Sequence, residues 1–175
     1  MLFRSIFTRD LGAQPPSLVT AAWVEGAFNP PESRSAAAQE AMRLSDELVY
    51  ELAAADTILI TTPIYNLSVP AALKAWIDQV VRVGRTFAFK DGAFAGLLSG
   101  KNAIVVVTSG SDLRPSGPGG AFNHLEPYLR AVLGFMGISA VRFVYAHSQN
   151  QADTQGGDAY REAQAELSTL AHPTS

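Results

Sequence analysis

Cysteine is absent from all 175 residues of the chain. Its absence excludes disulfide bonds, thiolate nucleophiles, iron–sulfur clusters and the common zinc sites. Histidines and carboxylates at the spacing of metal ligands are lacking as well, so we expect no metal ion. A chain without cysteine fits a reducing compartment, and we expect a cytoplasmic location.

Long apolar runs and an excess of one charge are also missing. The 13 basic and 16 acidic residues are dispersed and leave a net charge of −3, which indicates no surface for nucleic acid or anionic membranes. The apolar runs are far shorter than the roughly 20 residues of a membrane span, and Met1 to Phe7 is too short for a signal sequence. We expect neither nucleic acid nor a membrane as a partner.

The sequence does contain short apolar runs that alternate with amphipathic segments. Strands are predicted at Phe3–Thr8, Thr57–Thr62, Asn102–Val107 and Val141–Ala146. Helices are predicted at Ser35–Ala55, Val69–Val83, Phe122–Met136 and Asp153–Leu170. Arg9–Pro31 shows no clear helix or strand period and is interpreted as irregular. Gly84–Leu98 is interpreted as an insertion. Gly156-Gly157 is interpreted as a loop that enters the last helix. Nearly all-apolar strands between helices predict an α/β fold with a doubly wound parallel sheet, in a single domain of residues 1–175.

Two loops follow the carboxyl ends of the central strands, where ligands bind in such sheets. Pro63 to Ser68 offers the aromatic face of Tyr65 and the short amide of Asn66, which suit a planar heteroaromatic ligand. Thr108 to Gly120 is rich in serine and glycine, so backbone amides there can approach a ligand closely. Ordinary turns use the same residue types, and composition alone leaves both interpretations open.

Few other side chains are candidates for catalysis or for substrate contact. His124 and His147 stand alone at element ends, and structural roles are favoured for both over catalysis. Asp112 and Arg114 are interpreted as a solvated pair in preference to a substrate contact. Trp76 shares a helix face with core residues, which favours packing.

Several motifs in order resemble the FMN-dependent NADH azoreductases, which belong to the flavodoxin-like quinone reductases. The motifs run from Thr8-Arg9-Asp10-Leu11 to the last helix and cover nearly the whole chain. They are Pro63-Ile64-Tyr65-Asn66-Leu67 with Leu73-Lys74, Val83-Gly84-Arg85-Thr86-Phe87, Gly100-Lys101, Pro127-Tyr128-Leu129 and Leu133-Gly134-Phe135-Met136-Gly137-Ile138.

The resemblance implies a flavodoxin-like fold and the site residues. Flavin contacts fall on Ile64, Tyr65, Asn66 and Leu67, mainly through backbone groups, and on Thr108, Ser109, Gly110 and Ser111. The family often has two adjacent glycines where this chain has Gly110-Ser111. Phe87 and Phe135 match positions that line the substrate pocket, with core packing as the alternative. In the family, the site is completed across a homodimer.

The implied activity is an FMN-dependent two-electron reduction of quinones and azo compounds by NADH, with ping-pong kinetics in one shared pocket. No side chain is assigned as catalytic, because the cofactor transfers the hydride. An NADPH-dependent FMN reductase or a flavodoxin-type electron carrier remains an alternative, as does a cofactor-free, non-catalytic dimeric relative. Nicotinamide preference stays open, since no basic cluster marks a 2′-phosphate site.

The largest departure from the family lies at the N-terminus. Phe3 to Thr8 resembles the family's second strand, and the first strand, the phosphate-binding loop and the first helix have no counterpart. In the strand order 2-1-3-4-5, the first strand lies between the second and the third. We therefore expect an N-terminally shortened version of the fold with a gap in its sheet.

Overall fold

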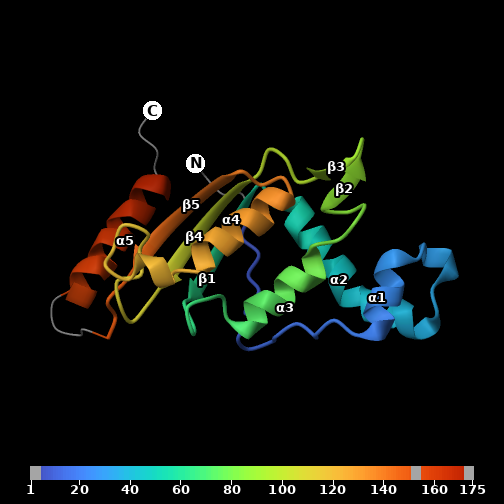
Figure 1. Ribbon diagram of the computed structural model, residues 1–175, viewed down its shortest axis with the longest axis horizontal. Coiled ribbons are helices and arrows are strands. Elements are labelled where there is room, and N and C mark those ends of the chain that lie inside the picture. The colour runs from blue at the N-terminus through green and yellow to red at the C-terminus, as the bar shows by residue number, and fades with distance from the viewer. Residues whose placement is uncertain (1–4, 151–154, 172–175) are drawn as a thin grey trace.

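The protein is described by a computed structural model that covers residues 5–150 and 155–171 (Figure 1). Its three-stranded sheet consists of β1 (Thr57–Pro63), β4 (Asn102–Thr108) and β5 (Ala140–Ala146), and a hairpin consists of β2 (Phe87–Lys90) and β3 (Ala93–Gly96). The helices are α1 (Ala21–Phe28), α2 (Ala36–Ala54), α3 (Ala71–Val80), α4 (Leu125–Phe135) and α5 (Gln155–Ala171), with short 3-10 helices at Pro31–Ser33 and Gly120–Phe122.

The main sheet is parallel and runs in the order β1-β4-β5. Thr57 pairs with Asn102, which in turn pairs with Ala140, and both ladders run without interruption to the carboxyl ends of the strands. Three predicted strands and four predicted helices are confirmed to within a few residues. The order also matches the last three strands of the expected 2-1-3-4-5 arrangement.

Helices cover both faces of the sheet, as the predicted double winding requires. Alternate residues of the strands, such as Ile60 and Val105, pack with side chains of α2, α3 and α4 in the main core. On the other face, Val144 and Ala146 pack with Ala163 of α5 in a smaller cluster. Figure 1 shows α5 separated from α3 and α4 by the strands.

Three expectations for other segments are wrong, and a fourth segment contains a hairpin that was not predicted. Residues 5–8 of the expected strand Phe3–Thr8 form no strand, and Phe3 lies outside the described residues. Arg9–Pro31 contains helix α1, which begins after Thr20, where the hydroxyl accepts a hydrogen bond from Trp23 N. Gly84–Leu98 contains hairpin β2–β3. Gly156-Gly157 lies inside the first turn of α5 and not in a preceding loop.

Strand β1 forms one edge of the described sheet. The expected gap is not seen in the described residues, because no strand lies beyond β1 to form its far side. The backbone of β1 pairs only with β4 among the described residues. On the sheet face away from the main core, Leu59 is 62% exposed, whereas Ile58 and Ile60 are buried. The ladder to β4 and the core below β1 therefore define the position of the strand.

Lys101, directly before β4, caps the C-terminal end of helix α2. Its ammonium group donates hydrogen bonds to Ala53 O at 2.7 Å and Ala55 O at 2.6 Å, which are carbonyls at the end of α2. Such contacts satisfy the free carbonyls of a helix C-terminus and favour a positive charge there.

Lys101→Met should therefore lower the free energy of unfolding by about 1 kcal/mol, because the hydrophobic replacement keeps the stem but leaves both carbonyls without their donor. Urea denaturation measures the change. Lys90→Met on the exposed hairpin is the matched control, and equal losses for both variants would contradict the capping role.

Candidate active site

The two predicted ligand loops lie side by side at the carboxyl edge of the sheet. Pro63 pairs with Thr108 at the ends of β1 and β4. One residue further, Ile64 N donates to Thr108 O at 2.8 Å. The parallel ladder therefore places the backbone of both loops at the same edge, as the fold requires of a ligand site.

The first loop is a tight two-residue turn. Tyr65 and Ser68 exchange two backbone hydrogen bonds of 3.0 Å, while Asn66 and Leu67 between them have φ angles of 47° and 73°. Two positive φ values are the signature of a type I′ turn. The amides of Asn66 and Leu67 donate no hydrogen bond to any described residue, and the Tyr65 ring is largely exposed.

The second loop is held from behind by the chain that follows β5. Gln149 N donates to Ser109 O at 3.0 Å and Asn150 N to Gly110 O at 3.2 Å. A Cβ atom on Gly110 would lie 2.4 Å from the amide nitrogen of the Asn150 side chain, so a larger residue here would require that side chain to move. Within the described part of the chain, the amides of Gly110 and Ser111 have no acceptor.

These two loops fit a planar heteroaromatic ring. In the described residues they present four backbone donors without a protein acceptor, one exposed aromatic face and no charged side chain between Ile64 and Ser68 or between Thr108 and Ser111. Free N–H groups at fixed positions stabilise negative charge that develops on a bound ring. The residues present therefore suit the ring of a flavin, and they would hold it chiefly through backbone groups.

Asp112 and Arg114 stiffen the continuation of the second loop. The Arg114 guanidinium donates to both Asp112 carboxylate oxygens, at 2.9 and 2.7 Å. This charged pair lowers the pKa of Asp112 below its ordinary value of 3.8. The side chain of Asp112 is only 16% exposed, so the expected solvated surface pair is instead a partly buried contact within the loop.

A lowered pKa makes the contribution of Asp112 depend on pH. The contribution is complete above the ordinary pKa of 3.8 and is lost as the pH falls below it, because the unfolded chain then takes up a proton more readily. The stability difference between the wild type and Asp112→Asn should therefore shrink between about pH 6 and about pH 3. Urea denaturation at both pH values tests this, and a constant difference would contradict it.

His124 and His147 both lie at this edge of the sheet. His147 follows β5 and is buried, with Nδ1 2.9 Å from Ser148 Oγ. Its Nε2 atom has no partner among the described residues. His124 is exposed, and its backbone N–H donates to Leu67 O at 3.0 Å, which places the start of α4 against the first loop.

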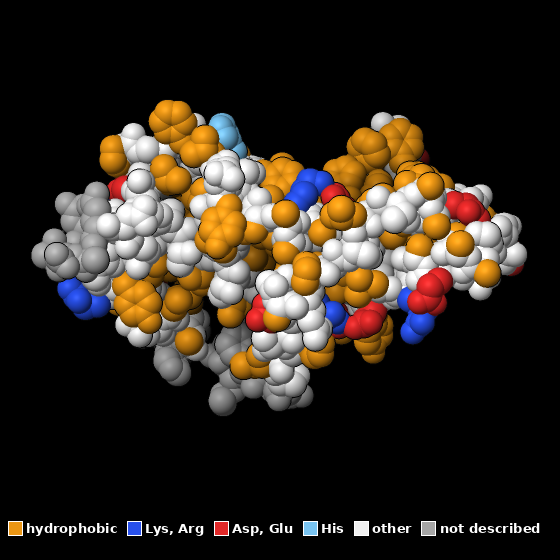
Figure 2. All heavy atoms as spheres, turned by 90° about the horizontal axis from the view of Figure 1, so that it is seen from below, with side chains coloured by type: hydrophobic (Ala, Val, Ile, Leu, Met, Phe, Trp, Pro, Cys, Tyr) orange, Lys and Arg blue, Asp and Glu red, His pale blue; other side chains and the backbone are white. Residues whose placement is uncertain are grey.

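Phe87 and Phe135 belong to an aromatic cluster that the sequence revealed only in part. Their ring centres are 4.5 Å apart, and Phe94 lies 5.2 Å from Phe135. Phe89 extends the cluster through Phe94 at 5.3 Å. Phe89 and Phe94 are more than 60% exposed on the hairpin, which projects from the body with hydrophobic side chains at its surface (Figure 2). The missed signal was the alternation of phenylalanines across a turn at Asp91-Gly92.

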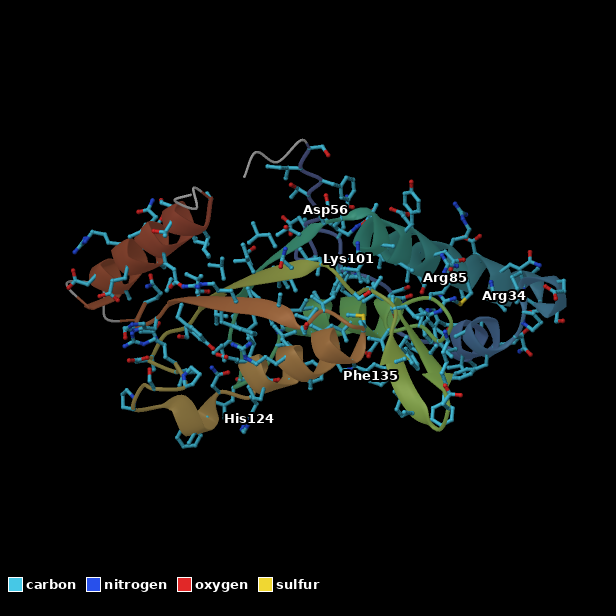
Figure 3. The ribbon with its side chains drawn as sticks, turned by 90° about the horizontal axis from the view of Figure 1, so that it is seen from above. Arg34, Asp56, Arg85, Lys101, His124 and Phe135 are labelled. Atoms are coloured by element: carbon cyan, nitrogen blue, oxygen red, sulfur yellow. The ribbon has the colours of Figure 1, made fainter. Side chains whose placement is uncertain are left out.

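Within one chain, this aromatic cluster does not meet the ligand loops. Figure 3 shows His124 and Phe135 at opposite ends of α4. A helix rises about 1.5 Å per residue, so Phe135 lies roughly 15 Å from the first loop. Trp76, in contrast, is half-buried and packs against the main core, as expected.

Residues 5–150 and 155–171 contain no group of three or more His, Cys, Asp or Glu side chains that could hold a metal ion. In the same residues, no helix is both long and apolar enough to span a membrane.

Comparisons with known proteins show the family of this chain. Residues 4–170 match the family described as having a flavodoxin-like fold. The FMN-dependent NADH:quinone oxidoreductase of Nostoc punctiforme is 42% identical over 151 residues, which are 86% of this chain and 74% of that protein. The FMN-dependent NAD(P)H:quinone oxidoreductase 1 of Pseudomonas aeruginosa is 44% identical over 169 residues, with coverages of 93% and 80%.

Solved structures agree on the fold. The azoreductase of Bacillus anthracis superposes with a TM-score of 0.85 at 21% identity, over 95% of this chain and 80% of that one. An FMN-dependent NADH-azoreductase from the same organism, solved in complex with FMN, gives 0.80 at 23% identity, with coverages of 93% and 80%. This chain belongs to the family with the flavodoxin-like fold that includes the FMN-dependent NADH:quinone oxidoreductases.

Proposed function

We propose that this protein is an FMN-dependent oxidoreductase that passes two electrons from NADH to a quinone. The observation that carries the proposal is the pair of adjacent loops whose free backbone N–H groups match a flavin ring. Relatives that are more than 40% identical bear this activity in their names. The lack of cysteine supports a cytoplasmic setting.

When bound, FMN would supply the hydride and electron chemistry. The residues of this chain would bind and orient the ring. The N–H groups of Asn66 and Leu67 would stabilise negative charge on the reduced ring, since the hydrogen bonds that close the turn join Tyr65 to Ser68 and leave both amides free. Ile64 and Tyr65 would cover one part of the ring, and Thr108 to Ser111 would contact another edge.

The substrate side of the site would require two copies of the chain. Phe135 lies at the end of α4 away from the first loop (Figure 3), and the ring centre of Phe87 is 4.5 Å from that of Phe135, so neither ring would line a pocket at the loops of its own chain. The exposed rings of Phe89 and Phe94 would also be covered in a dimer. A homodimer that places the aromatic cluster of one copy beside the loops of the other satisfies both requirements. Quinones and azo compounds, which are flat and apolar, would bind between ring and cluster.

One pocket for both substrates implies ping-pong kinetics. Double-reciprocal plots at several NADH concentrations, with FMN and the naphthoquinone menadione, should give parallel lines. Intersecting lines would contradict a shared pocket while leaving the flavin site intact. Replacing menadione with an azo dye tests the second substrate class in the same assay.

Native mass spectrometry with FMN tests the assembly. The proposed enzyme should appear as a dimer with one FMN per chain. A dimer that binds no flavin would instead support a non-catalytic relative, and a stable one-electron semiquinone on reductive titration would support an electron carrier.

A further inference from the structure

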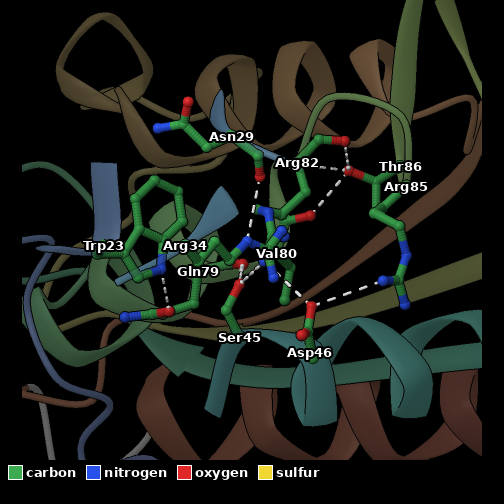
Figure 4. Close-up of polar contacts among 10 residues, drawn as sticks. All are labelled: Trp23, Asn29, Arg34, Ser45, Asp46, Gln79, Val80, Arg82, Arg85 and Thr86. Atoms are coloured by element: carbon green, nitrogen blue, oxygen red, sulfur yellow. Dashed lines mark hydrogen bonds and ion pairs between the residues drawn. The ribbon is translucent and has the colours of Figure 1, made fainter. Parts of the chain in front are cut away.

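Arg82 lies at the junction between α3 and the hairpin and is 3% exposed. Its Nη1 donates to Ser45 Oγ of α2 at 2.5 Å and lies 3.4 Å from Asp46 Oδ1. The guanidinium carbon lies 5.7 Å from the ring centre of Trp23 in α1. Figure 4 shows this group between α2 and the turn that leads to β2. The backbone at residue 82 is thereby tied to two helices.

Thr86 fixes the other end of the same turn and is fully buried. Its hydroxyl donates to Val80 O at 2.8 Å and accepts from Arg82 N at 2.9 Å. Arg82 O accepts in turn from Thr86 N at 2.9 Å and Phe87 N at 3.3 Å. One hydroxyl therefore connects the end of α3 to the residue before the hairpin.

The returning strand of the hairpin is held at the same residue. Leu97 N donates to Thr86 O at 3.0 Å, and Leu98 N donates to Met136 O at 2.9 Å. Phe87, next to Thr86, brings its ring to 4.5 Å from Phe135. The position of Thr86 thus sets where both hairpin strands leave the body and where Phe87 meets α4.

We propose that Thr86 is the positioning residue for the aromatic substrate pocket, with the buried Arg82 as its support. The hydroxyl of Thr86 fixes the turn that places Phe87 and Phe94 against Phe135, so it sets the affinity for a flat aromatic acceptor without contacting that acceptor. This inference rests on the proposed function, because the cluster is assigned there as the substrate side of the site.

The test compares Thr86→Val, which keeps the shape and removes the hydroxyl, with Thr86→Ser, which keeps the hydroxyl. We expect Thr86→Val to raise the KM for menadione at least fivefold, while kcat and the FMN dissociation constant stay within twofold. Thr86→Ser should restore the wild-type KM within twofold. A general loss of structure would change all three quantities together and would contradict a role confined to the pocket.

Hydrogen exchange supplies a readout that needs no activity. The amides of Phe87 and Leu97 should exchange at least tenfold faster in Thr86→Val than in Thr86→Ser, while those of Val105 and Val144 in the sheet stay unchanged. Equal exchange in both variants overturns the positioning role. Faster exchange with an unchanged menadione KM overturns its link to the substrate.

Failure of the proposed function would give a different pattern. If the hairpin amides exchange faster in Thr86→Val but the wild-type protein reduces no quinone, the proposed function is overturned, and with it the substrate half of this inference. If Thr86→Val does not fold, Ser45→Ala removes the nearer of the two acceptors of Arg82 Nη1 and should give the same changes in KM and exchange, at smaller size. An unchanged KM and unchanged exchange in that variant would overturn the inference.

Discussion

Gly96→Ala should lower the free energy of unfolding by about 3 kcal/mol, near the upper end for overpacking in a core. A Cβ atom on Gly96 would lie 2.1 Å from Gly137 N and 2.4 Å from both Gly137 Cα and the Met136 carbonyl carbon. All three atoms are backbone, so no side chain can move aside. The hairpin would have to separate from the end of α4, which takes Phe94 away from Phe135. Urea denaturation measures the loss.

Gly134→Ala is the matched control, because a Cβ atom at this position on α4 meets nothing within 4 Å. Alanine there should raise stability by roughly 0.5–1 kcal/mol through its better helix propensity. Opposite signs for the two variants are therefore expected. A Gly96→Ala protein as stable as the wild type would show that the hairpin does not pack against α4 as described.

Leu67→Pro should weaken FMN binding at least 100-fold, which corresponds to about 2.7 kcal/mol. Proline fixes φ near −65°, whereas Leu67 has a φ of 73°. It also removes an N–H group that is assigned to the flavin. The substitution therefore removes both the turn geometry at Leu67 and its N–H donor. Quenching of flavin fluorescence on binding gives the dissociation constant.

Leu67→Gly distinguishes the contribution of the Leu67 backbone to FMN binding from that of its side chain. Glycine adopts a positive φ without strain and keeps the N–H group, so FMN should bind within about threefold of the wild-type affinity, as backbone contacts require. If Leu67→Gly weakened binding as much as Leu67→Pro, the side chain would be the contact, and the assignment of backbone donors would be wrong.

The sequence predicted the regular part of the fold well because its signals are local. The apolar run Thr57–Thr62 and the helix-start signal at Ser35 both mark elements by periodicity or capping, and both elements are present. The pairing of Pro63 with Thr108 follows from topology, since parallel strands end at one edge. That rule alone brings the two ligand loops together.

The missed elements depend on contacts between distant residues. Helix α1 has a buried face of only Trp23 and Gly26, too short for a periodic pattern. It is held by a hydrogen bond of 2.7 Å from Trp23 Nε1 to Gln79 Oε1, 56 residues away. Likewise, the role of Gly96 is visible only once Gly137 lies against it. Residues 5–8 resemble a strand in their local apolarity, but no described strand pairs with them.

The separation of Phe87 and Phe135 from the ligand loops is a property of the folded chain that no local sequence pattern indicates. It follows from the length of α4, whose start contacts Leu67 and whose end carries Phe135. The same distance is the reason why the proposed site is shared by two copies.

The visible absorption spectrum of FMN titrated with the purified chain is the decisive measurement for the flavin site. We expect a saturable shift of the flavin bands at one FMN per chain, with the bound flavin bleached by NADH and restored by menadione. A spectrum that stays that of free FMN at every protein concentration would contradict the assignment of the two loops as a flavin site.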